Sequence, residues 1–133
     1  MNLFPIILLA TTLTTSNMVA AGTIAGTIAA LTGALANNHD ECSRIHPRVL
    51  NAIDTFCKKT DIVIPSWYGN AGAVDKDDVF WVGITGKCKP AQWVPQKYCK
   101  SQFYDMCAHA DKNGESTRHY GNGKCQEWGI YRN

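Results

Sequence analysis

The sequence predicts an α+β fold: a small, disulfide-stabilised, two-layer α/β sandwich in which two helices pack on an antiparallel sheet. Segments with apolar residues at helical spacing alternate with β-branched and aromatic runs, in the order helix, strand, strand, helix, strand, strand. The six cysteines are an even number, as is typical of disulfides in a small exported protein. A chain of 133 residues closes one modest core, so we expect a single cysteine-rich domain over residues 37–133.

The N-terminal segment, residues 1–36, contains no Lys, Arg, Asp or Glu and is predicted to be a secretion signal. Its apolar run, Leu3–Leu9, has the length of a signal-peptide core and is too short to cross a bilayer about 30 Å thick. Small residues allow cleavage after Ala21, which would leave a short leader on the mature protein, or after Ala36. The alternative is a signal anchor that stays in the membrane. We favour cleavage and an extracellular protein.

Residues 43–59 are predicted to form the first helix. Ser43 can cap its N-terminus, and Pro47 is tolerated because it falls in the first turn. Lys58 and Lys59 suit the negative end of the helix dipole. The apolar stripe that would face the core consists of Ile45, Val49, Leu50, Ile53, Phe56 and Cys57.

The next part of the chain predicts two strands separated by a loop. Residues 61–65 are rich in β-branched side chains and end at a proline, which is typical of a short strand. Residues 66–78 contain glycines and an acidic run and are predicted to be a loop. Residues 79–85 are almost continuously apolar, which indicates a strand in a central position of the sheet.

A second helix and a closing hairpin complete the predicted fold. The helix is expected from Pro95 to about Ala110, with Cys99 and Cys107 on its apolar face. A covalent connection from this helix to its neighbours is therefore expected. After a polar loop, residues 118–131 predict a hairpin, because the Gly-Asn-Gly tripeptide within it can adopt the positive φ angles of a tight turn.

The cysteines are expected to form three disulfides, each stabilising the fold by about 2–4 kcal/mol. The sequence leaves all fifteen pairings open. Zinc binding is the alternative, but the chain has no Cys-x-x-Cys pair, and the most closely spaced Cys and His are Cys107 and His109. The six cysteines are Cys42, Cys57, Cys88, Cys99, Cys107 and Cys125.

The segment Gln102–Cys107, with Cys88 before it and Cys125 after it, resembles the subunits of a virus-encoded fungal killer toxin and the killer-toxin-like secreted effectors that share their fold. The resemblance covers about residues 42–128. It implies a compact α/β sandwich and a secreted fungal effector or toxin-like protein without enzymatic activity. It identifies no active-site residues in this sequence. That toxin is cut at dibasic sites, whereas the one pair here, Lys58-Lys59, falls in the predicted first helix, so we expect an uncut chain.

Aromatic and basic residues provide the candidate binding positions. Aromatic side chains on loops supply much of the energy of protein interfaces, and lysines interleaved with aromatics can meet anionic lipid headgroups. The alternative is an ordinary soluble face beside a disulfide. The candidate residues are Trp67, Tyr68, Lys87, Lys89, Trp93 and Lys97.

These features lead us to expect an effector of the virulence or avirulence type that binds a host or target-cell protein as a monomer. The first alternative is a killer or antimicrobial toxin that acts on membranes. A net charge of +2 gives no reason to expect a nucleic-acid partner.

A small secreted ribonuclease is the remaining alternative. Glu115, Arg118 and His119 lie close in sequence and include a base, a phosphate-binding group and an acid, with His46 or His109 as a second imidazole. Such clusters are usually solvated loop residues, so we expect no catalytic residues.

The acidic run Asp75, Asp77 and Asp78 could offer oxygen ligands to calcium. Its spacing matches no known calcium loop, and Lys76 lies within it. We therefore expect a solvated acidic loop, no metal site and no cofactor.

Overall fold

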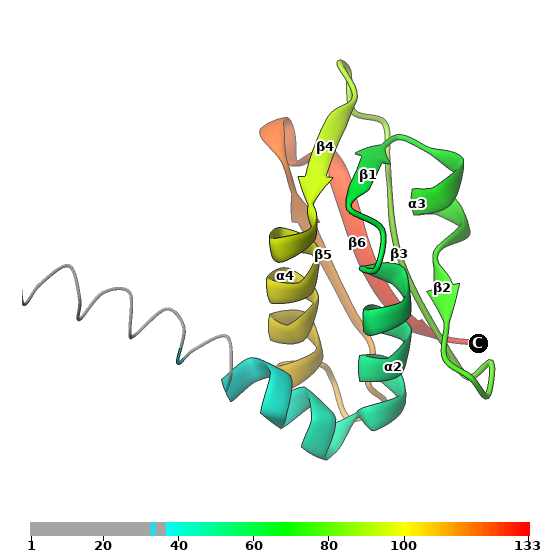
Figure 1. Ribbon diagram of the computed structural model, residues 1–133, viewed down its shortest axis with the longest axis vertical. Coiled ribbons are helices and arrows are strands. Elements are labelled where there is room, and N and C mark those ends of the chain that lie inside the picture. Colours follow the sequence, from blue (N-terminus) through cyan, green and yellow to red (C-terminus); the bar gives the residue numbers. More distant parts are fainter. Residues whose placement is uncertain (1–32, 34–36) are drawn as a thin grey trace, which may run out of the picture.

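Two helices lie side by side on one face of an antiparallel sheet (Figure 1). The structure is a computed structural model, and it describes Gly33 and residues 37–133. The predicted α+β fold class, with its disulfides, is confirmed. The predicted secretion signal lies outside the described residues, apart from Gly33. Within the part of the chain that the structure describes, no helix is long and apolar enough to cross a membrane.

The helical layer begins earlier than predicted and is interrupted. Residues 37–45 are helical, His46 leaves the helical conformation with φ −136° and ψ 61°, and α2 then runs over Pro47–Phe56. Proline disfavours the helical conformation of the residue before it, so two helices meet where one was expected. Because α2 ends at Phe56, the dibasic pair lies in the turn after the helix, and its predicted position inside the helix is wrong.

The apolar stripe of α2 packs against α4 (Gln96–Ala108) and the sheet. Val49, Ile53 and Phe56 are fully buried, as their helical spacing predicted. The α4 helix starts one residue after the predicted position at Pro95 and buries Cys99, Phe103, Met106 and Cys107.

The larger sheet has the strand order β2-β3-β6-β5, with antiparallel neighbours. The predicted strand over residues 79–85 is β3, and it lies inside the sheet, which confirms the expected central position. β5 and β6 form the predicted hairpin, although a short 3-10 helix, η1 (Asn122–Lys124), replaces a two-residue turn. The strands are β2 (Ala73–Val74), β3 (Phe80–Gly86), β5 (Ser116–Tyr120) and β6 (Gln126–Arg132).

A second, two-stranded sheet pairs β1 (Asp61–Ile64) with β4 (Gln92–Pro95). β1 was predicted, whereas β4 was not. Side chains alternate between the two faces of this sheet. Ile62 lies opposite Val94 on the buried face, and Val63 lies opposite Trp93 on the exposed face.

The region predicted as a loop, residues 66–78, contains a short helix, α3 (Trp67–Ala71), and strand β2. Ser66 caps α3 by accepting a hydrogen bond from the backbone N–H of Gly69, at 3.0 Å. A Cβ on Gly69 would lie 2.5 Å from the carbonyl oxygen of Ile84, so only glycine lets α3 approach β3 this closely.

The disulfides pair Cys42 with Cys107, Cys57 with Cys99, and Cys88 with Cys125. Two of them fasten α4 to the helical segments before it, so the expected covalent connection of this helix is confirmed. The third joins the β3–β4 loop to the residue before β6. Three disulfides within a chain of this size are typical of extracellular proteins.

Candidate functional site

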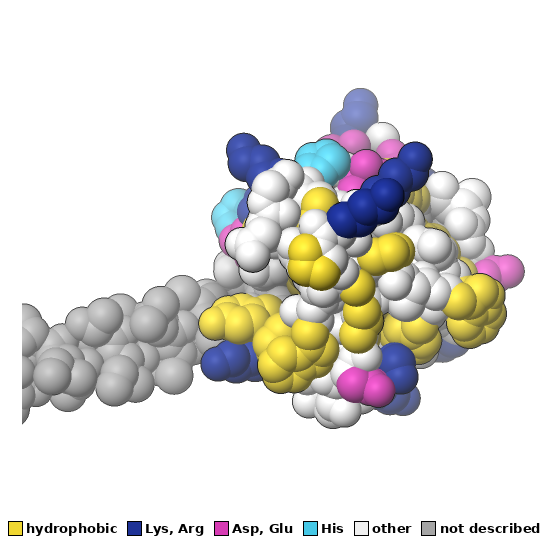
Figure 2. Space-filling model, turned by 90° about the horizontal axis from the view of Figure 1, so that it is seen from above, with side chains coloured by type: hydrophobic (Ala, Val, Ile, Leu, Met, Phe, Trp, Pro, Cys, Tyr) yellow, Lys and Arg dark blue, Asp and Glu magenta, His cyan; other side chains and the backbone are white. Residues whose placement is uncertain are grey.

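The end of β4 and the start of α4 carry two exposed aromatic rings. Trp93 is 62% exposed and Tyr98 is 49% exposed, while Val63, opposite Trp93 on β1, is 37% exposed. The ammonium nitrogen of Lys97 lies 5.0 Å from the centre of the Tyr98 ring. We call these four residues, Val63, Trp93, Lys97 and Tyr98, the aromatic–lysine surface. Seen from the end that carries the β3–β4 loop, hydrophobic side chains gather along one side of the molecule, with Lys or Arg side chains next to them (Figure 2).

The position of Trp93 follows from the backbone around it. Trp93 and Val94 alternate along β4, so burial of Val94 turns the indole of Trp93 outward. The indole N–H donates a hydrogen bond of 3.2 Å to the carbonyl oxygen of Thr60. β4 continues directly into α4, and Cys99, one residue after Tyr98, is bonded to Cys57. The surface is therefore presented by strand and helix residues next to a disulfide.

A cavity of about 150 Å³ opens beside these rings. Drug-sized ligands and cofactors occupy pockets of about 300–1,000 Å³, so this cavity has room for one side chain. Tyr98 and Gln102 contribute from α4, and none of the described residues that line the cavity is charged. Its principal walls are Trp93, Tyr98, Gln102, Tyr120, Gln126 and Trp128.

One wall of the cavity is held by a network of amide side chains. The Oε1 of Gln92 accepts hydrogen bonds from the backbone N–H of Asn122, at 3.1 Å, and from Nε2 of Gln126, at 3.0 Å. Nε2 of Gln92 donates to the carbonyl oxygen of Asn122 at 3.2 Å. Gln126 in turn accepts from the indole N–H of Trp128 at 2.9 Å. This network, centred on Gln92, connects β4 to the β5–β6 hairpin.

The two lysines of the β3–β4 loop lie near Gln92. Lys87 and Lys89 line an open hollow of about 640 Å³ together with Asn122 and Gln92. The structure therefore brings Trp93 and Lys97 to the same ring, that of Tyr98, and Lys87 and Lys89 to a neighbouring hollow.

Trp67 and Tyr68, predicted together as contact residues, have different environments. Trp67, at the start of α3, is 82% exposed. The ring of Tyr68 stacks on Phe56 with centroids 5.2 Å apart, and its hydroxyl donates to the carbonyl oxygen of Phe56 at 2.6 Å. Burial raises the pKa of Tyr68. Tyr68 therefore packs against the core, and Trp67 is left as an exposed ring on α3.

The residues considered for ribonuclease chemistry are only partly brought together: His109 and Arg118 both contact Asp105, whereas His119 does not share the face of Arg118. Arg118 and His119 are consecutive residues of β5, so their side chains point to opposite faces of the sheet. Arg118 forms an ion pair with Asp105. The carboxylate of Glu115 accepts a hydrogen bond from the backbone N–H of Arg132 at 3.0 Å.

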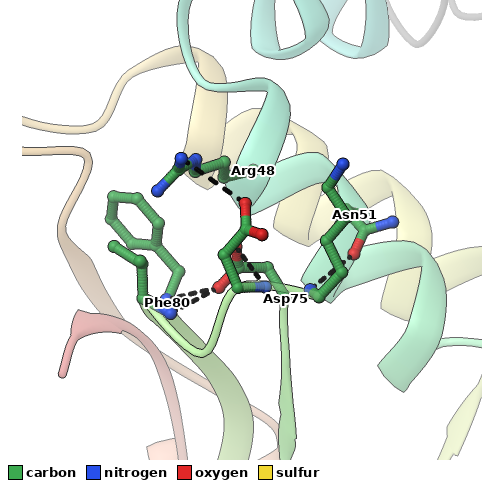
Figure 3. Close-up of polar contacts among 7 residues, drawn as sticks. Arg48, Asn51, Asp75 and Phe80 are labelled. Carbon is green, nitrogen blue, oxygen red and sulfur yellow. Dashed lines mark hydrogen bonds and ion pairs between the residues drawn. The ribbon is translucent and has the colours of Figure 1, made fainter.

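The acidic run has a structural role at the β2–β3 turn (Figure 3). Asp75 is only 2% exposed. Its Oδ1 accepts hydrogen bonds from the backbone N–H groups of Val79 and Phe80, at 2.8 and 2.7 Å, and its Oδ2 accepts a longer one from Asp77 at 3.4 Å. Asp77 itself lies 3.4 Å from the guanidinium of Arg48. Among the residues that the structure describes, no cluster of His, Cys, Asp and Glu could hold a metal ion.

The backbone donors also set the ionisation of Asp75. Burial alone would raise the pKa of this carboxyl. The hydrogen bonds from the N–H groups of Phe80, Val79 and Asp77, together with the charge of Arg48, have a larger effect in the opposite direction. The pKa of Asp75 therefore lies below its ordinary value of 3.8. The turn is therefore held by a buried carboxylate that stays ionised at neutral pH.

We expect Asp75→Asn to lower the free energy of unfolding by about 1–3 kcal/mol at neutral pH, because a charged acceptor of backbone hydrogen bonds is lost. The folded-state pKa is depressed, so the carboxylate stabilises the fold above its unfolded-state pKa and loses this effect as the pH falls through the folded-state pKa. Urea denaturation of both proteins at neutral pH and below pH 3.8 measures the difference, which should shrink in acid. An equal difference at both pH values would contradict this role.

The described site offers exposed rings, a neighbouring ammonium group and a cavity the size of one side chain, on elements joined by a disulfide and an amide network. Such an arrangement can bind part of another molecule. Comparisons of the chain with protein-family models, with curated proteins and with solved structures found no match.

Proposed function

We propose that this chain is a secreted, non-enzymatic binding protein of the effector type, which acts on a host or target-cell component through the aromatic–lysine surface. Three disulfides and the predicted secretion signal support an extracellular location. The resemblance of Gln102–Cys107, with its flanking cysteines, to killer-toxin-like fungal effectors supports the class of protein.

The observation that carries the proposal is the exposure of Trp93 and Tyr98 on ordered elements. Tryptophan and tyrosine dominate the energetics of protein interfaces, because they bury a large area and lose little conformational freedom. Both rings here are already oriented, Trp93 by its strand and by the hydrogen bond to Thr60, and Tyr98 by its helix. Binding would therefore cost little additional ordering.

A membrane-active toxin is the second candidate, and the position of Lys97 favours it. An ammonium group beside an exposed indole and phenol is the combination that meets an anionic lipid surface. The two candidates share one surface and differ in the partner.

The test uses the product secreted from the full-length chain, carrying a C-terminal epitope tag, with its mass measured before and after reduction. Titrated onto intact plant and yeast cells, it should bind saturably to one of them, and protease treatment of those cells should remove the binding. We expect Trp93→Ala to weaken binding at least about tenfold, the effect of a truncated hot-spot residue.

Val74→Ala is the control, since it removes an exposed apolar side chain from β2, which belongs to the other sheet. It should bind as the wild type does. Equal binding by Trp93→Ala and the wild type would overturn the proposed surface. Release of dye from anionic vesicles, in place of protease-sensitive binding, would favour the toxin.

A further inference from the structure

The surface around Trp93 lies in a long stretch of chain without acidic residues. From Val79 to Tyr104 there is no Asp or Glu, while the stretch includes Lys87, Lys89, Lys97 and Lys100. The acidic run lies in the β2–β3 turn, at the opposite end of the molecule from the β3–β4 loop (Figure 1). One exposed carboxylate, that of Asp61, lies on the same face of the two-stranded sheet as Val63 and Trp93, and it is paired with Lys59 at 2.7 Å. A net positive charge therefore remains around Trp93, although the net charge of the chain is only +2.

The structure places positive charges near an uncharged cavity. Lys97 lies over the Tyr98 ring, which forms one side of the cavity, while Lys87 and Lys89 line a neighbouring hollow together with Gln92 and Asn122. At about 150 Å³, the cavity can take one apolar side chain. The side chains of Trp128 and Gln126 in its walls are buried, so that side chain would be desolvated as it enters.

We propose that the aromatic–lysine surface binds an acidic peptide segment of a partner protein that carries one aromatic or branched aliphatic anchor residue. The anchor enters the cavity between Trp93 and Tyr98, and carboxylates beside it face Lys97 and the lysines of the β3–β4 loop. This inference rests on the proposed function and adds the chemistry of the partner. Charge complementarity favours an acidic segment, because like charges across an interface are costly.

The size of the cavity distinguishes a peptide from a lipid surface. A membrane surface would use the exposed rings and the lysines but would not need a hollow of the size of one side chain between the rings. The network from Gln92 to Gln126 and Trp128 holds the walls of this space in place before any ligand arrives. Preorganisation of this kind favours a partner with a defined anchor.

The probe is a random-peptide phage library, selected on the oxidised protein secreted from the full-length chain. We expect enriched peptides to have one Trp, Phe, Leu or Ile next to Asp or Glu. For a synthetic copy of an enriched peptide, Kd should rise at least about tenfold in Trp93→Ala. Kd should also rise in Lys97→Glu and with added salt, because charges at an exposed rim are screened.

Two matched variants serve as controls. Val74→Ala removes an exposed apolar side chain from β2, and Lys112→Glu reverses an exposed charge in the α4–β5 loop, so both should bind the peptide as the wild type does. Enriched peptides without acidic residues, or equal binding by Trp93→Ala, would overturn the inference.

The failure of this inference can be told apart from the failure of the proposed function. If no peptide is enriched but Trp93→Ala still loses cell binding, the acidic-segment inference is overturned and the binding surface stands. If anionic vesicles bind and no peptide does, the inference is likewise overturned in favour of a lipid partner. If Trp93→Ala binds both peptides and cells as the wild type does, both proposals are overturned.

Discussion

Replacing Cys42 and Cys107 together with alanine is expected to lower the free energy of unfolding by about 4 kcal/mol. This disulfide joins residues 65 apart in sequence, and a cross-link over a long loop removes much of the freedom of the unfolded chain. The helix over residues 37–45 has few other connections to α4, among them a hydrogen bond from Asn38 to Asp105. Its backbone amides should therefore exchange with solvent much faster in the variant than in the wild type.

Guanidinium denaturation and amide hydrogen exchange measure these two effects. Replacement of Cys88 and Cys125 with alanine is the control, because that bond lies at the β3–β4 loop, away from the N-terminal helix. It should destabilise the domain without selectively exposing residues 37–45. Unchanged exchange over residues 37–45 after loss of the Cys42–Cys107 bond would contradict the assigned role.

The second large effect is expected for Phe103→Ala, which should cost about 3–5 kcal/mol of unfolding free energy. Phe103 is fully buried between the two layers, with its ring centroid 4.7 Å from that of Trp128 on β6 and 5.8 Å from that of Phe56 on α2. Truncation would leave a cavity where both layers meet. Since small domains are stable by only about 5–15 kcal/mol, much of the protein's stability would be lost.

Urea denaturation, followed by the near-ultraviolet signal of the packed aromatic rings, measures this loss. Phe103→Leu keeps most of the side-chain volume and should cost less than about 1.5 kcal/mol of unfolding free energy. Comparison of the alanine and leucine variants therefore shows how much of the loss comes from the empty volume. If the alanine and leucine variants were equally stable, Phe103 could not be the contact that joins the layers.

Strong periodicity made the larger elements predictable. The stripes of α2 and α4 and the apolar run of β3 are signals within one element. α4 and β3 were found near their predicted bounds, whereas α2 is shorter than the helix predicted over residues 43–59. β4 and α3 were missed because each is very short, and β4 is stabilised by pairing with β1, which lies far from it in sequence. The break at His46 was missed because a proline in a first turn is compatible with one continuous helix.

The candidate site was only partly predictable, because some of its contacts join elements that lie far apart in the sequence. Trp93 and Lys97 are close because β4 runs straight into α4, which is a local property of the chain. Burial of Tyr68 against Phe56 depends on how two separate elements pack, and so does the hollow that Lys87 and Lys89 line with Asn122. The choice among fifteen disulfide pairings also depends on tertiary structure.

The loops closed by the bonds Cys42–Cys107 and Cys88–Cys125 overlap along the sequence, and this overlap determines what a protease can release from the protein. Every peptide bond between Cys42 and Cys125 lies inside at least one of these two closed loops. A single hydrolysis anywhere in that range, including the exposed turn at Lys58, would add one water molecule and release no fragment. The two pieces would separate only after reduction, so a nicked molecule would keep its polypeptide segments together.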